Sequence, residues 1–102
     1  MSNIETFKHL LEKDSDNALL RYSLGNEYFK EKNFEEAILH LEKALELYPS
    51  YSAAWKLFGK ALAANGDIKL AIDTYKKGIS VAEKNGDKQA AKEMKVFLNR
   101  LK

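Results

Sequence analysis

Apolar residues recur every three or four positions along most of this chain, which is the spacing of one face of an α-helix. Leu20, Leu24 and Tyr28 form one such stripe, and Leu41 and Leu45 belong to the next. No segment of the sequence alternates apolar and polar residues convincingly, as a half-buried β-strand does. The pattern predicts helices near residues 3–13, 17–31, 34–47, 52–65, 68–84 and 87–101.

The boundaries between these helices carry residues that start or stop a helix. Asn33 and Glu36 have the spacing of a capping box, in which each side chain satisfies a free backbone N–H group. Residues 65–67 and 85–87 both read Asn-Gly-Asp, which places a glycine at one helix end and an aspartate at the next start. Pro49 blocks continuation of the helix that begins near residue 34.

The stripes repeat at a fixed interval of 34 residues, so that residues 18–51 align with residues 52–85. Small or apolar residues coincide at six places: Leu24 with Phe58, Gly25 with Gly59, Ala37 with Ala71, Ile38 with Ile72, Leu41 with Tyr75 and Ala44 with Gly78. A glycine inside a helix costs about 1 kcal/mol relative to alanine. Its recurrence therefore predicts close approaches, of Gly25 to the helix carrying Ala37 and of Gly59 to the helix carrying Ala71.

The repeat resembles the tetratricopeptide repeat, a helix–turn–helix unit with a Trp-x-x-Leu-Gly-x-x-Tyr motif followed by alanine, an aromatic residue, alanine and proline. Residues 55–62 (WKLFGKAL) and 21–28 (RYSLGNEY) match this motif, although Arg21 stands where tryptophan is usual. Glu83 takes the place of the second unit's proline, so we expect its last helix to reach about Lys84. The resemblance implies an all-α fold, a right-handed superhelix of antiparallel helix pairs.

The same resemblance implies one domain over residues 1–102. Its parts are an N-terminal half-unit helix (1–17), two full repeats (18–51 and 52–85) and a C-terminal capping helix (86–102). The capping helix departs from the register of the repeats by two residues. Its apolar side is predicted to hold Ala90, Ala91, Met94, Phe97, Leu98 and Leu101.

The resemblance further implies a concave surface, lined by the first helix of each pair, that holds extended peptides or helices of partner proteins. The repeat phase places on it Leu19, Tyr22, Asn26, Phe29, Lys30, Ala53, Lys56, Lys60, Ala63 and Ala64, with Lys92 as a possible extension. The predicted partner-binding residues are Tyr22, Asn26, Phe29, Lys56, Lys60 and Ala63.

Tyr22 and Phe29 lie two helical turns apart on one face. If exposed, they form a pair of aromatic anchors for a partner, and otherwise they pack against neighbouring helices. Lys56 and Lys60 are four residues apart with no acid between them on that face. They are either solvated surface or a site for an acidic segment or C-terminal carboxylate, for which Asn26 supplies a hydrogen-bonding amide.

Some members of the resembled family grip a C-terminal carboxylate with two lysines, two asparagines and an arginine. Asn26 fills one such place, but Tyr22 and Leu57 stand where a lysine and an asparagine are expected. A complete carboxylate clamp is therefore not expected. Trp55 is predicted to pack between helices, and Arg21 to extend to the surface.

The chemistry-bearing residues are few. His9 and His40 lie in different helices without the spacing of a metal pair, and we expect His40 at the surface. There is no cysteine, glycine-rich phosphate loop or nucleophile elbow. We therefore expect no enzymatic activity and no cofactor. The start of the sequence lacks the layout of a secretory signal, and no apolar run approaches the ~18 residues of a membrane span, so the expected location is the cytoplasm.

Composition fits one small globular domain, with 45% hydrophobic and 31% charged residues in 102. The net charge of +2 hides an asymmetry, since residues 1–51 carry −4 and residues 52–102 carry +6. The leading interpretation is a non-enzymatic protein-interaction module. The alternative is self-association of the acidic and basic halves. A basic tail that binds membrane or RNA is disfavoured, because the last helix needs its apolar side for packing.

Overall fold

Six α-helices and their short connections make up the part of the chain that the computed structural model describes, residues 2–13 and 16–102. The helices are α1 (Asn3–Lys13), α2 (Ala18–Lys30), α3 (Phe34–Leu47), α4 (Ser52–Ala64), α5 (Ile68–Asn85) and α6 (Lys88–Leu101). No strand occurs in these described ranges. Each predicted helix is confirmed, with both ends within one residue of the expected position.

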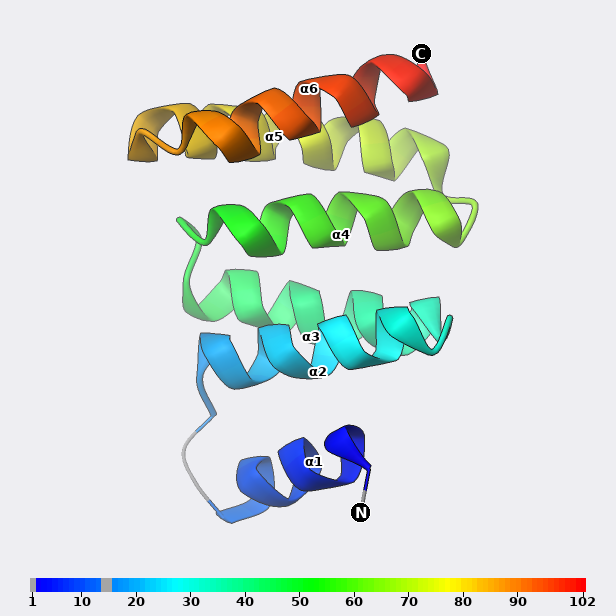
Figure 1. Ribbon diagram of the computed structural model, residues 1–102, viewed down its shortest axis with the longest axis vertical. Coiled ribbons are helices and arrows are strands. Elements are labelled where there is room, and N and C mark those ends of the chain that lie inside the picture. The colour runs from blue at the N-terminus through cyan, green and yellow to red at the C-terminus, as the bar shows by residue number, and fades with distance from the viewer. Residues whose placement is uncertain (1, 14–15) are drawn as a thin grey trace.

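The helices stack as antiparallel pairs along the long axis of a molecule that measures 39 × 28 × 18 Å (Figure 1). α2 packs against α3 and α4 against α5, while α3 also packs against α4, and α6 covers both α5 and α4. In Figure 1, α2, α4 and α6 lie nearer the viewer, with α3 and α5 behind them. The first helices of successive units therefore form one continuous layer.

Side-chain caps and left-handed glycines set the helix ends. Asn17 Oδ1 accepts a hydrogen bond from the Leu20 N–H at 2.8 Å, and Asn33 Oδ1 accepts one from the Glu36 N–H at 3.4 Å. Gly86 ends α5 with a φ of +75°, a conformation that costs a glycine little. Asp87 caps α6 through the Ala90 N–H, as predicted, whereas the side chain of Asp67 makes no such cap for α5.

Two glycines allow the paired helices to approach each other. A Cβ atom on Gly25 would lie 2.7 Å from Leu41 Cγ, and one on Gly59 would overlap the ring of Tyr75. The predicted close approach is thus confirmed at both places. The nearest side chains to the two glycines are Leu41 and Tyr75, one turn beyond Ala37 and Ala71, and not the alanines themselves.

α6 closes the far end of the stack with its apolar side. Ala90, Ala91, Met94 and Leu98 are buried, and Phe97 and Leu101 are half-buried against the same cluster, so the predicted face of α6 is confirmed. Met94 packs on the bare backbone of Gly78, where a Cβ atom would lie 2.6 Å from its Sδ. The apolar side of α6 is therefore occupied by the fold.

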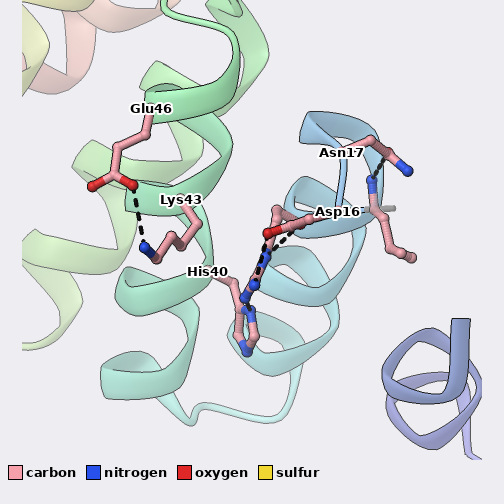
Figure 2. Close-up of polar contacts among 7 residues, drawn as sticks. Asp16, Asn17, His40, Lys43 and Glu46 are labelled. Carbon is pink, nitrogen blue, oxygen red and sulfur yellow. Dashed lines mark hydrogen bonds and ion pairs between the residues drawn. The ribbon is translucent and has the colours of Figure 1, made fainter. Parts of the chain in front are cut away.

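The contact between α2 and α3 contains a chain of polar groups (Figure 2). Asp16 accepts two hydrogen bonds from Arg21, at 2.8 and 2.9 Å, and Arg21 Nη1 lies 3.0 Å from His40 Nδ1. The His40 ring stacks on Tyr28 with centroids 5.5 Å apart and an angle of 5°. The prediction that His40 is a surface residue was wrong, because α3 turns this position toward Arg21 and leaves it 7% exposed.

Trp55 packs against the clusters on both sides of α4, as predicted. Its ring is half-buried, and Nε1 donates a hydrogen bond to the Pro49 carbonyl at 2.8 Å. This bond satisfies the indole N–H and ties α4 to the loop that precedes it.

We predict that Gly59→Ala destabilises the protein by about 1–3 kcal/mol, because the new methyl group meets the buried Tyr75 ring. Gly25→Ala should cost less, since the end of the Leu41 side chain can shift. Urea unfolding of both variants measures the difference. At an unhindered helix position, the same substitution would stabilise by about 1 kcal/mol, so a gain at Gly59 would contradict the packing described.

We also predict that stability falls as the pH is lowered from 7.5 to 5.5. Burial, and secondarily the Arg21 charge, lower the pKa of His40, against a smaller opposing effect of Glu36; Lys8 and Asp16 also act on the ring. The unfolded chain therefore takes up a proton near pH 6.5 that the folded protein binds only at lower pH.

The test is the change in unfolding free energy over that pH range. Replacing His40 with glutamine should flatten the pH dependence, whereas His9→Gln, at an exposed position, should leave it unchanged. An unaltered slope in His40→Gln would contradict the assignment.

Candidate functional site

The six residues predicted to contact a partner lie on two neighbouring helices of one layer. Tyr22, Asn26 and Phe29 are on α2, and Lys56, Lys60 and Ala63 are on α4. All six are half-buried, so each packs partly against its neighbours and keeps part of its surface exposed to solvent. Among the other residues of the predicted row, Ala53 is half-buried, whereas Leu19, Lys30 and Ala64 are exposed.

An aromatic cluster occupies the end of this row near the α3–α4 connection. The ring of Tyr22 lies 5.1 Å from that of Tyr51, which in turn lies 5.5 Å from Tyr48. Burial raises the pKa of the Tyr51 hydroxyl, which therefore stays protonated. Tyr48 and Tyr51 line a shallow hollow of about 530 Å³ that reaches Asn85 on α5.

The centre of the row holds an ion pair that the sequence analysis did not predict. Lys56 Nζ lies 2.9 Å from Glu93 Oε1 on α6. The acid comes from a different helix, and spacing along α4 does not report it. Lys92 does not extend the row, since it is exposed and lines another hollow with Glu83 and Lys95.

A second aromatic cluster lies at the other end, where α2, α4 and α6 meet. Lys60 Nζ lies 5.5 Å from the ring centroid of Phe29 and 5.6 Å from that of Phe97. The guanidinium of Arg100 lies 5.8 Å from the Phe97 centroid. These side chains, together with Ala63, Tyr75 and Leu101, line a hollow of about 270 Å³.

Sequence reasoning missed several residues of the two clusters. Tyr48 and Tyr51 flank Pro49 in a connection, and Phe97 and Arg100 lie on the helix that departs from the repeat register. The available signal was the concentration of aromatic residues around Pro49, and no comparable signal marked Arg100. The phase of the first two units predicts positions on α2 and α4. It does not predict which residues α6 brings beside them, because α6 departs from that register.

The side chains of this row are of kinds that take part in molecular recognition. It offers aromatic faces, two ammonium groups and the amide of Asn26, which makes no hydrogen bond to another residue in the described ranges. Within residues 2–13 and 16–102, no three His, Asp or Glu side chains are grouped so as to hold a metal ion. Across the same residues, none of the helices combines the length and apolar character required to span a bilayer.

Comparison with known proteins shows the family. The tetratricopeptide repeat profile matches residues 18–51 and again residues 53–85. This chain belongs to the tetratricopeptide repeat family. Over 96% of its length it is 47% identical to the TPR repeat-containing protein PA0015 of Pseudomonas aeruginosa, and the match covers 93% of that relative.

Solved tetratricopeptide repeat structures confirm the predicted superhelix of helix pairs. The solution structure of protein BPP2914 from Bordetella parapertussis has a TM-score of 0.88 and 40% identity, over 99% of this chain and 88% of that one. The second TPR domain of human RPAP3, solved in complex with the HSP70 peptide SGPTIEEVD, has a TM-score of 0.79 and 28% identity. That match covers 96% of this chain and 77% of the RPAP3 chain.

We predict that the Lys56–Glu93 pair contributes roughly 0.2–1 kcal/mol, because exposed ion pairs gain little in water. The two side chains are 30% and 38% exposed, so solvent screens the pair. A double-mutant cycle with Lys56→Gln, Glu93→Gln and the combined variant, followed by urea unfolding, isolates this coupling. A coupling well above 2 kcal/mol would show that the pair is too strong for a ligand to open.

Proposed function

We propose that this protein is a non-enzymatic interaction module of the cytoplasm that holds a segment of a partner protein. The segment, extended or helical, lies along the row formed by Tyr22, Asn26, Phe29, Lys56, Lys60 and Ala63. The observation that carries this proposal is the half-buried state of all six side chains, which combines anchored positions with open surface. Anchored aromatic residues are the side chains that most often dominate binding energy.

An acidic partner segment fits the charges along the row. The RPAP3 domain binds a peptide that contains two glutamates and ends in aspartate. In this chain, a ligand carboxylate near Lys56 must compete with Glu93, whereas Lys60 has no such competitor among the described residues. A short segment of this kind is expected to bind at micromolar concentration, equivalent to about −8 kcal/mol, because its ordering offsets part of the contact energy.

Self-association is the second candidate, and the charge distribution favours it. Residues 1–51 form the acidic half and residues 52–102 the basic half, so head-to-tail contact of two copies pairs opposite charges. Both candidates weaken at high salt. They differ in what occupies the groove.

Capture of binding partners from the native lysate tests the proposed function. The groove variant Lys56→Glu/Lys60→Glu should lose the proteins that wild type retains, because it reverses two charges in the row. Lys69→Glu/Lys76→Glu is the matched control, since both lysines are exposed on α5 and the net charge changes equally. Circular dichroism of both variants confirms that they fold.

A peptide mapped from a captured protein should bind wild type at least tenfold more tightly than the groove variant, and less tightly as salt is raised. If the groove variant and the control variant bind the peptide equally well, the interaction lies outside the groove. Recovery of this chain alone would favour self-association.

A further inference from the structure

Lys60 differs from the other half-buried basic residues because it has no acidic partner among the described residues. Three basic residues are half-buried in the part of the chain described here, namely Arg21, Lys56 and Lys60. Arg21 is paired with Asp16 and Lys56 with Glu93. Lys60 makes no ion pair with any described residue, and its ammonium group lies over the rings of Phe29 and Phe97. Its three N–H donors therefore remain available to an anion.

A second cation lies at the same hollow. Arg100 is exposed beside Phe97, and it too makes no ion pair among the described residues. Two positive charges thus border a space of about 270 Å³ whose remaining walls are largely apolar. An anion at this place gains from both charges, and the walls exclude part of the water that would otherwise screen them.

The side of the hollow formed by α5 adds a hydrogen-bonding group. Tyr75 lines the hollow and is only 2% exposed, yet its hydroxyl makes no hydrogen bond to another described residue. Burial raises the pKa of Tyr75 to about 12, so the hydroxyl is protonated and can donate. No buried side-chain nitrogen or oxygen among the described residues lacks a partner, so the unbonded Tyr75 hydroxyl reaches solvent, where an acceptor of a ligand can meet it.

We propose that this hollow, lined by Phe29, Lys60, Tyr75, Phe97 and Arg100, receives a glutamate side chain from within the partner segment. This inference rests on the proposed function. The methylene groups of the glutamate pack between Phe29 and Phe97. Its carboxylate accepts hydrogen bonds from Lys60 and Arg100, and Tyr75, which lines the same hollow, supplies a further donor.

An internal glutamate fits this hollow better than the end of a chain. A chain terminus brings its peptide N–H with it, and among the residues that line the hollow only Tyr75, through its hydroxyl, carries a side-chain acceptor for that group. Burying an unpaired amide is costly. A glutamate side chain consists of two methylene groups followed by a carboxylate. The methylene groups contact the apolar walls, and the carboxylate contacts the two cations.

Peptide selection on the full chain tests the inference. A library of random twelve-residue peptides is fused at its C-terminus to a display protein, so that no free terminus is offered. Selected sequences are then synthesised with blocked ends, and their affinities are measured by fluorescence anisotropy. Lys60→Gln/Arg100→Gln is the test variant. Lys69→Gln/Lys76→Gln, on exposed positions of α5, removes the same charge elsewhere.

We expect the selected peptides to share a glutamate. Replacing it with glutamine should weaken binding to wild type and to the control about tenfold, the size of a charged hydrogen bond, and should have little effect on the test variant. Selected peptides without a shared glutamate, or equal binding to the test variant, overturn the inference and leave the groove function standing. Failure to select any peptide contradicts the proposed function itself.

Discussion

The stacking of this molecule depends on side chains that lie against bare backbone. Leu41 packs onto Gly25, and Tyr75 packs onto Gly59, at equivalent places in the two units. No other residue type leaves room for these contacts, so each glycine gives up helix propensity for close packing. Because the contact recurs every 34 residues, one helix pair is placed on the next in the same way, and a continuous layer of first helices results.

That layer decides which side chains are available for recognition. On α2 and α4, Gly25 and Gly59 lie on the side that packs within the pair, whereas the predicted partner-binding residues of the same helices remain half-buried. Long side chains such as Lys60 then lie across the gap between helices and contact rings from both neighbours. Cation–π contacts hold the ammonium group in place without neutralising it, which leaves a positioned charge for a ligand.

α6 serves two purposes because its register differs from that of the repeats. The shift buries Met94 against Gly78 and closes the apolar end of the stack. It also turns Glu93 toward Lys56 and brings Phe97 and Arg100 to Lys60. The helix that terminates the fold therefore also divides the groove into a neutralised centre and a positive end.

The sequence alone determined the helices, the repeat and the burial pattern, since these follow from local periodicity, capping residues and the spacing of Gly25 and Gly59. It also predicted which positions of α2 and α4 are equivalent, because their phase carries from one unit to the other. Only the tertiary structure decided the partners of Lys56 and Lys60 and the burial of His40. Those contacts join residues from different helices, such as Lys56 and Glu93, 37 positions apart, and periodicity within one helix carries no information about the charge that a neighbouring helix brings.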